Sequence, residues 1–379
     1  MSLDKTTVCH ELKILKKIQE TNDTYSLVLE VPRTTGGKFL YKAGQFITFF
    51  LNIDGHELHR SYSLASSPDY ETEFKVAIKL MPEGKGSAYL ISKTSVGDKL
   101  WATPPAGAFC LPLNIEKHKL VFYAGGSGIA PIISMIKSAL KTSRTCECVL
   151  LYQSRDENQI IYKAELDNLI KEFAPRLKVE HTISRPDINW PGLKGRTDKA
   201  LLKGFLQRNE AGVSAIHFLC GPEGFMQAIE TGLIDMNVEK SNIKKESFTV
   251  RPSIASASHL AGGDASTKDL TLDEDAVIIG DRSKLSSPET IEATIEGKTH
   301  IVPYKKDKTV LECLMNAGLN PPYSCLDGAC MACIAKIESG LVYQDDMGIL
   351  TEDNLDANEC LTCQARPASK KVKVTYEIF

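Results

Sequence analysis

The sequence predicts a multidomain fold that combines an antiparallel β-barrel, a parallel sheet covered by helices and a small α+β domain. The chain has 379 residues, more than a single hydrophobic core usually serves. Near residue 117 the apolar pattern changes from short strands to alternating strands and helices, and six of the eleven cysteines lie at or after Cys313. We therefore expect domains at residues 1–116, 117–250 and 290–379, with a linker at 251–289.

The composition is typical of a soluble globular protein, with 42% hydrophobic and 25% charged residues and a net charge of −3. This balance gives no indication of nucleic-acid binding. The sequence contains neither an apolar run long enough to span a membrane nor an N-terminal secretion signal. We expect a cytoplasmic protein whose cysteines are metal ligands or thiols rather than disulfides.

Residues 8–115 contain short apolar segments separated by Gly, Pro, Asn and Asp, which predicts a small antiparallel barrel. In this region Arg60-Ser61-Tyr62-Ser63 follows a turn, and Gly86 and Ser87 precede a helix-like segment. A guanidinium group and a helix N-terminus bind anions, and Tyr and Ser offer a stacking face and a hydrogen bond. Together these residues could hold a flavin, whereas residues 60–63 alone also fit an ordinary strand with an exposed arginine.

From residue 118 onward, strands and helices alternate, which predicts a parallel sheet covered by helices. The segment 120–131 joins an apolar strand to a helix through Gly125, Gly126 and Gly128, so that backbone amides can meet a pyrophosphate. The pattern differs from the G-x-G-x-x-G fingerprint, and no acidic residue ends an obvious second strand about 20 residues later. A nicotinamide-binding domain of another type is indicated.

The C-terminal part of the chain differs in composition from the rest. Residues 251–289 are rich in Ser, Ala, Gly and Asp without sustained periodicity, as in a partly disordered linker. Residues 290–379 start and end with strand-like segments, which indicates a separate domain. Residues 264–379 carry 20 acidic and 12 basic side chains, a surface that either steers a basic docking face or is simply solvated.

The cysteine spacing is the strongest signal in the chain. Cys325, Cys330 and Cys333 form a C-x4-C-x2-C group, and Cys363 follows after a long gap, which is the plant-type spacing for a [2Fe-2S] cluster. A structural zinc site usually has paired short spacings, and ordinary buried cysteines are the other alternative. With four ligands assigned, we expect two further cysteines to be buried thiols, namely Cys313 and Cys360.

Two family resemblances follow from these motifs. Residues 290–379, including ECLTCQARP around Cys363, resemble plant-type ferredoxins, which implies a β-grasp fold. Residues 1–250 resemble the ferredoxin–NADP reductase superfamily through the segments 60–63, 125–131 and 220–222.

The reductase resemblance implies roles for the residues of the barrel. Arg60 would contact the flavin phosphate, Tyr62 the isoalloxazine and ribityl region, and Ser63 the N5 edge of the ring. Gly86 and Ser87 would contact the pyrophosphate. These roles agree with the anion-binding chemistry of the same residues.

The same resemblance places Cys220 near the nicotinamide, with Gly221 and Pro222 beside it. The segment Glu246-Ser247-Phe248 would close the domain with an aromatic ring that covers the flavin, although Phe248 also fits a plain core residue. We therefore expect Ser63, Cys220, Glu246 and Phe248 at the reacting centre. They are expected as contact residues rather than general acids or bases, because hydride transfer requires the two rings to be positioned correctly.

Three residues bear on the choice of nucleotide. Ser184 and Arg185 follow a predicted strand at the place where NADPH-using relatives hold the 2′-phosphate, and Arg155 could assist. Guanidinium groups suit a phosphate dianion, which favours NADPH over NADH. Contact with the ribose or with solvent is the alternative, and NADH-using relatives can carry similar residues.

The order of the domains is similar to that of the three-domain reductases that include the reductase components of phenylacetyl-CoA epoxidase and ketosteroid hydroxylase. This resemblance implies FAD, a [2Fe-2S] cluster and NADPH or NADH as cofactors. It also implies an oxygenase, hydroxylase or desaturase as the electron acceptor. A nicotinamide gives two electrons and the cluster takes one, so a flavin must stand between them. A non-oxygenase acceptor such as a hybrid-cluster protein is an alternative, as is a non-catalytic redox sensor or carrier.

Overall fold

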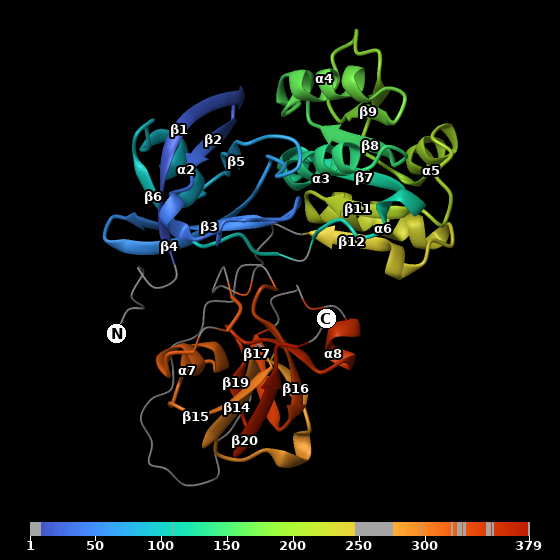
Figure 1. The fold of residues 1–379 in the computed structure, drawn as a ribbon. Helices are drawn as coiled ribbons and strands as arrows, with labels where there is room; N and C mark the ends of the chain where they lie inside the picture. Colours follow the sequence, from blue (N-terminus) through green and yellow to red (C-terminus); the bar gives the residue numbers. More distant parts are fainter. Residues whose placement is uncertain are drawn as a thin grey trace. The chain divides into compact units, whose positions relative to one another are not determined.

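The computed structural model describes residues 9–107, 109–246, 276–295, 297–319, 321–323, 328, 331–345, 350 and 352–377. The chain divides into two compact units, residues 1–248 and residues 249–379 (Figure 1). The first unit holds an antiparallel and a parallel sheet, and the second holds two smaller sheets. The predicted fold class is confirmed.

The antiparallel sheet of the first unit has six strands in the order β4-β3-β6-β1-β2-β5. An isolated bridge between Leu64 and Val76 joins the two ends of the sheet, as in a barrel. Alternate side chains such as Leu12, Ile14 and Phe49 fill its core. Its elements are β1 (His10–Thr21), β2 (Thr24–Glu30), β3 (Phe46–Ile53), β4 (His56–Ser63), β5 (Phe74–Lys79), α2 (Lys85–Ser92) and β6 (Lys99–Ala102).

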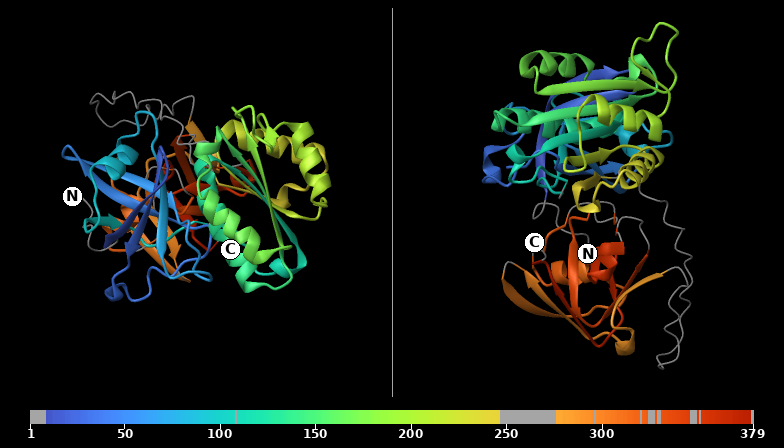
Figure 2. Two further views of the ribbon diagram at one scale, coloured as in Figure 1. Left: turned by 90° about the horizontal axis from the view of Figure 1, so that it is seen from above. Right: turned by 90° about the vertical axis from the view of Figure 1, so that its right-hand side faces the viewer.

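The parallel sheet has the strand order β10-β9-β8-β7-β11-β12, and helices flank it on both faces (Figure 2). Its strands are β7 (Lys119–Gly125), β8 (Glu147–Ser154), β9 (Leu177–Ile183), β10 (Leu193–Lys194), β11 (Ile216–Cys220) and β12 (Ile243–Glu246). The helices are α3 (Ile129–Thr142), α4 (Lys163–Phe173), α5 (Lys199–Arg208) and α6 (Glu223–Asp235).

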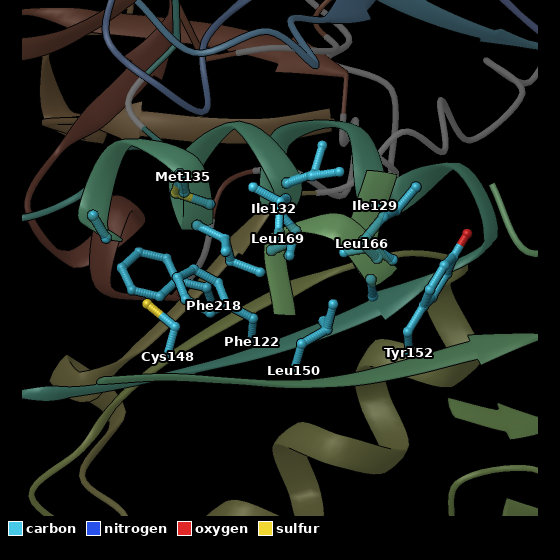
Figure 3. Packing of buried hydrophobic residues seen from close by; sticks show 14 of the residues in the cluster. Phe122, Ile129, Ile132, Met135, Cys148, Leu150, Tyr152, Leu166, Leu169 and Phe218 are labelled. Atoms are coloured by element: carbon cyan, nitrogen blue, oxygen red, sulfur yellow. The ribbon is translucent and has the colours of Figure 1, made fainter. Parts of the chain in front are cut away.

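Both faces of this sheet are buried, which explains the nearly continuous apolar sequence of β7. Phe122 packs on one face under Ile132 and Met135 of α3 (Figure 3). The neighbouring residue Tyr123 points to the opposite face and packs with Phe205 of α5. Successive residues of a strand point to opposite faces, so each needs an apolar partner.

The second unit has a five-stranded sheet in the order β15-β14-β20-β16-β18 and a three-stranded sheet in the order β13-β17-β19. Strand β14 pairs with β20 in parallel and with β15 in antiparallel orientation, the arrangement of a β-grasp domain. Thr309 and Glu312 form a capping box at the start of α7. The elements are β13 (Ala276–Gly280), β14 (Thr290–Ile295), β15 (Lys298–Pro303), α7 (Val310–Asn316), β16 (Ile334–Ser339), β17 (Leu341–Asp345), α8 (Glu352–Asp356), β18 (Glu359–Leu361), β19 (Arg366–Pro367) and β20 (Lys371–Thr375).

The expected linker at 251–289 needs a correction at its C-terminal end. Residues 276–280 form strand β13, which pairs along its length with β17, and a short 3-10 helix follows at 282–284. The apolar residues of AVIIG complete the three-stranded sheet and bury Ile279, so this segment belongs to the C-terminal unit. Residues 251–275 lie outside the described part of the chain.

Candidate functional site

The parallel sheet reverses its strand order between β7 and β11, and ligands of such sheets bind at the carboxyl ends of the strands at this point. Gly125 ends β7 and Cys220 ends β11. A Cβ atom on Gly221 would lie 2.9 Å from Cα of Gly125, and one on Gly128 would collide with the carbonyl oxygen of Cys220. Glycine permits this close approach, so the glycines expected from the sequence form one site with Cys220.

The turn after β7 has a defined backbone shape. Gly126 has a φ of +54°, in the region that favours glycine, and its carbonyl accepts a hydrogen bond from the Tyr152 hydroxyl at 3.0 Å. A side chain on Gly125 would meet the ring of Pro222 at 2.8 Å. Helix α3 begins directly after this turn without a side-chain cap, so its N-terminus suits a pyrophosphate.

The expected reacting centre brings together residues from both sheets of the first unit. The Ser63 hydroxyl, at the end of β4, donates a hydrogen bond of 3.2 Å to Oε2 of Glu246, at the end of β12. Glu246 is the register partner of Cys220 across β11 and β12. Three of the four residues expected at this centre are therefore neighbours. The fourth, Phe248, lies outside the described residues.

The electrostatics of this centre keep its groups uncharged near neutral pH. Burial raises the pKa of Glu246 to about 8, and the hydrogen bond from Ser63 opposes this shift only in part. Burial, and to a smaller extent the Glu246 carboxylate, raise the pKa of the Cys220 thiol well above its usual value. Glu246 therefore holds a proton that it can release slightly above neutral pH.

The residues of the barrel fit the phosphate and ring of a flavin. A Cβ atom on Gly86 would lie 2.8 Å from Cγ of Arg60, so glycine lets the start of α2 lie against the arginine. The Ser87 hydroxyl donates to the Gly84 carbonyl at 3.0 Å and accepts from the Met81 amide at 3.1 Å. It holds the turn before the helix. An exposed guanidinium group beside a helix N-terminus is a suitable anion site.

Tyr62 lies between Arg60 and Ser63 on β4 and is half-buried. Burial raises the pKa of its phenol, and the nearby charge of Arg60 lowers it in part. The phenol is therefore neutral and can contribute a stacking face or a hydrogen bond. The β4 residues, α2 and the Ser63–Glu246 pair together fit a bound flavin.

The structure brings the three residues expected at the nucleotide 2′-position together at the ends of β8 and β9. The Ser184 amide donates to the Ser154 carbonyl at 3.0 Å, and the Arg185 amide donates to the Arg155 carbonyl at 2.8 Å. Both arginines are exposed. Two guanidinium groups on adjacent strand ends form a positively charged edge that fits a phosphate.

The two described cysteines of the expected cluster lie close together. The carbonyl of Cys333 accepts hydrogen bonds from the Thr362 amide and hydroxyl, at 3.2 and 2.8 Å, so Cys363 is adjacent to that segment. Both sulfurs belong to a small apolar cluster with Leu311 and Leu361. Their position fits the shielded thiolates of an iron–sulfur centre.

The structure describes two of the four remaining cysteines of the C-terminal unit. Cys325 and Cys330 lie outside the described residues. Cys313 and Cys360 are buried in the core of the second unit, with 2% and 0% exposed surface, which confirms the expectation that they are core thiols. Gly328, between Cys325 and Cys330 in the sequence, has a φ of +69°, a backbone conformation that favours glycine.

Sequence reasoning missed a buried ionic network between the barrel and the parallel sheet. Lys137 in α3 has no exposed surface, and its Nζ contacts Glu71 at 2.6 Å, the Ala65 carbonyl at 3.1 Å and Glu165. Lys75 of β5 also contacts Glu165, at 3.1 Å. Burial works to raise the pKa of Glu165, and the two lysines outweigh it and hold the pKa below its usual value.

This network joins the two halves of the first unit. Glu71 and Lys75 come from the barrel, and Lys137 and Glu165 come from helices of the parallel sheet. The residues expected to bind the flavin and the nicotinamide lie on different halves of this unit, so a rigid contact between the halves would keep them aligned. A lysine among the apolar residues of α3, IAPIISMIKSAL, is the signal that could have revealed it.

Comparison with protein-family models divides the chain into three matched regions. The oxidoreductase FAD-binding domain matches residues 11–111, the oxidoreductase NAD-binding domain residues 122–231, and the 2Fe-2S iron-sulfur cluster binding domain residues 293–368. The chain is therefore an oxidoreductase with FAD, a nicotinamide nucleotide and a [2Fe-2S] cluster as its cofactors. Within the described segments, no helix is long and apolar enough to cross a membrane.

The full length of the chain is similar to known reductase components. It is 30% identical over 366 residues to the 3-ketosteroid-9-alpha-monooxygenase ferredoxin reductase component of Rhodococcus rhodochrous, with 96% of each chain covered. It is 26% identical over 379 residues to a component of the 1,2-phenylacetyl-CoA epoxidase of Escherichia coli K12, with 98% of each covered. The solved structure of phthalate dioxygenase reductase shares the fold, with a TM-score of 0.57, 22% identity, and 98% and 99% of the two chains covered.

Proposed function

This chain belongs to the same family as the ferredoxin reductase components of 3-ketosteroid-9-alpha-monooxygenases, and from that premise we propose that it supplies electrons to a partner oxygenase. Electrons would pass from NAD(P)H through FAD and the [2Fe-2S] cluster to that partner. The observation that carries this proposal is the meeting of Ser63, Glu246 and Cys220 where the flavin and nicotinamide residues converge.

The reacting centre has a defined division of roles in this proposal. A bound FAD would supply the chemistry that links two-electron transfer from the nicotinamide to one-electron transfer to the cluster. Ser63 would face the reacting edge of the flavin, and Cys220 would pack beside the nicotinamide as an uncharged thiol. Glu246 is protonated near neutral pH and its Oε2 accepts the hydrogen bond of the Ser63 hydroxyl, and Phe248 would cover the flavin ring.

The cofactor anchors follow from the chemistry of their neighbourhoods. Arg60, Tyr62, Gly86 and Ser87 bind the flavin. Gly125, Gly126, Gly128, Gly221 and Pro222 shape the turns that receive the nicotinamide nucleotide. Cys325, Cys330, Cys333 and Cys363 supply the four thiolates of the cluster, a set that the plant-type spacing supports.

NADPH is the proposed electron donor. The adjacent strand ends place Arg155 and Arg185 side by side through a backbone hydrogen bond of 2.8 Å. The Ser184 hydroxyl lies at the same edge and can donate to a phosphate. A 2′-phosphate would meet two guanidinium groups there, whereas NADH offers only a ribose hydroxyl.

The acceptor is proposed to be an oxygenase component, such as a monooxygenase, hydroxylase or desaturase. The names of the relatives support this class, because they describe parts of monooxygenase and epoxidase systems. The acidic C-terminal domain supports an electrostatic encounter with a basic face of the acceptor. In this chain the reductase part would comprise residues 1–250, and the ferredoxin domain that passes electrons to the acceptor would begin near residue 276.

The proposed location is the cytoplasm, and the state of the cysteines supports it. Disulfides are rare in that compartment. Described cysteines outside the proposed cluster are thiols, among them Cys110, Cys146, Cys148, Cys220, Cys313 and Cys360.

A spectroscopic and a reconstitution experiment test the proposal together. The purified protein should show flavin and iron–sulfur absorption that NADPH bleaches faster than NADH under anaerobic conditions. It should then support substrate turnover by the oxygenase component of a 3-ketosteroid-9-alpha-monooxygenase. Bleaching without turnover, together with rapid reduction of a hybrid-cluster protein, would replace the oxygenase by a different acceptor. A cluster that stays oxidised while the flavin bleaches would contradict the electron path.

A further inference from the structure

Gln364 follows Cys363 directly and makes a hydrogen bond to its sulfur. The side-chain Nε2 of Gln364 lies 3.5 Å from Sγ of Cys363. In a glutamine amide the nitrogen is the donor, so the bond points an N–H group at the sulfur. Gln364 thus differs from a neighbour that merely packs beside the cysteine.

The backbone explains why the side chain reaches the preceding residue. The amides of Gln364 and Ala365 both donate to the Leu361 carbonyl, each at 2.8 Å. The chain therefore turns tightly around Cys363. The half-buried Gln364 side chain is held beside the sulfur by this turn.

The surroundings make such a donor energetically important. Cys333 and Cys363 have 1% and 7% exposed surface and pack with Leu311 and Leu361. Negative charge on a buried sulfur is costly unless N–H dipoles face it. Hydrogen bonds in an apolar environment are stronger than in water.

Hydrogen bonds to cluster sulfurs change the reduction potential. The reduced cluster carries one more negative charge than the oxidised cluster, and its cysteine sulfurs share part of that charge. A donor aimed at sulfur stabilises the more negative state more strongly, because hydrogen bonds to charged acceptors are stronger. Such a donor therefore raises the potential.

We propose that Gln364 is a positioning residue that raises the reduction potential of the [2Fe-2S] cluster through its hydrogen bond to Cys363. This inference rests on the proposed role of Cys363 as a cluster ligand. Its consequence is directional: Gln364 favours transfer of the single electron from the flavin to the cluster. The side chain acts through the sulfur and takes no part in bond making.

The test is the midpoint potential of the cluster in the full chain, followed by electron paramagnetic resonance. Gln364→Met keeps the length of the side chain and removes the donor. Its potential should fall, with a shift of the flavin–cluster equilibrium of about threefold to tenfold toward the flavin, and tenfold corresponds to about 59 mV for one electron. Gln364→Asn keeps the amide but shortens the side chain by one methylene group, so the hydrogen bond should weaken and the potential should shift in the same direction.

Gln344→Met is the matched control. Gln344 is also in the second unit and accepts a hydrogen bond from the Leu361 amide at 2.9 Å, so its replacement tests general loosening of the same region. Its cluster potential should equal that of the wild type. Equal shifts in the Gln344 and Gln364 variants, or unchanged potentials in both Gln364 variants, would overturn the inference.

The ligand assignment is tested separately with Cys363→Ser. Replacement of a thiolate ligand by an alkoxide changes or abolishes the resonance spectrum of the reduced cluster. An altered spectrum together with unshifted Gln364 potentials would reject the role of Gln364 alone. An unaltered Cys363→Ser spectrum would reject both the ligand assignment and the inference drawn from it.

Discussion

The hydroxyl of Ser63 lies 3.2 Å from Oε2 of Glu246 and donates a hydrogen bond to it. This contact joins the end of β4 in the barrel to the end of β12 in the parallel sheet, and Cys220 is the strand partner of Glu246. It lies where the residues proposed to bind the flavin and the nicotinamide meet. Burial of Glu246 at this place raises its pKa to about 8 against the opposing effect of the Ser63 hydrogen bond, so the carboxyl group is protonated at neutral pH.

The unusual pKa of Glu246 predicts a pH-dependent infrared signal. The carbonyl stretch of a protonated carboxyl should persist at pH 7 and disappear with a pKa of about 8. Glu246→Gln should remove that signal. Glu230→Gln, which replaces a carboxylate paired with Lys245 at the surface, should leave it unchanged. A wild-type carboxyl signal that disappears near pH 4.5 would contradict the burial argument.

The same shift has a consequence for stability. The folded protein binds the proton of Glu246 more tightly than the unfolded chain, so stability from this group is complete below about pH 4.5 and falls as the pH rises to about 8. The slope for one proton is about 1.4 kcal/mol per pH unit. The free energy of unfolding of Glu246→Gln, measured from pH 5 to 8, should not show this decrease with rising pH.

Lys137→Met should destabilise the first unit strongly. It leaves Glu71 and Glu165 without their shared buried cation, and removal of one partner from a buried ion pair costs about 3–5 kcal/mol. Lys163→Met removes an exposed pair with Asp167 and should cost less than about 1 kcal/mol. Denaturant unfolding of the full chain measures both changes, and equal costs would show that the network contributes little.

The ionic network also predicts how the stability of the first unit changes at acidic pH. The pKa of Glu165 is held below 4.5, so its ionic contribution is present above that pH and is lost as the pH falls through the lower folded value. The difference in unfolding free energy between wild type and Glu165→Gln should therefore shrink below about pH 4.5. A difference that is constant from pH 7 to pH 3 would argue against an ionised Glu165.

Arg185→Ala should discriminate between the two nicotinamide nucleotides. Loss of a charge-assisted hydrogen bond costs about 1.5–3 kcal/mol, so KM for NADPH should rise about tenfold to one hundredfold while KM for NADH changes little. Steady-state flavin reduction measures both constants. Arg208→Ala, at an arginine that pairs with Glu180, is the control. Parallel changes for NADPH and NADH would remove the 2′-phosphate assignment.

Two neighbouring cysteines should behave differently on replacement. Cys363→Ser should leave reduction of the flavin by NADPH intact and abolish the cluster-dependent reduction of cytochrome c. Cys360→Ala, only three positions earlier, should retain the cluster, because Cys360 is buried in the core of the domain rather than in the apolar cluster around Cys333. Stopped-flow absorbance separates the two steps. Full cytochrome c reduction by Cys363→Ser would exclude this cysteine from the pathway.

The sequence alone determined the features that depend on local spacing. The separation of Cys325, Cys330 and Cys333 predicts a cluster because three thiolates on one tight loop need small intervals. The change from period-two strands to alternating strands and helices predicts the two sheets of the first unit. Gly125, Gly126 and Gly128 predict a phosphate turn because backbone amides need the absence of side chains.

The tertiary structure alone decided the contacts between distant segments. Ser63 and Glu246 meet across 183 positions of the chain, and Lys137 contacts Glu71 and Glu165, which lie on two other segments. The strand character of residues 276–280 also depended on pairing with β17. Local periodicity determines which segments form strands or helices, whereas strand order and burial determine which side chains meet and how far their pKa values move.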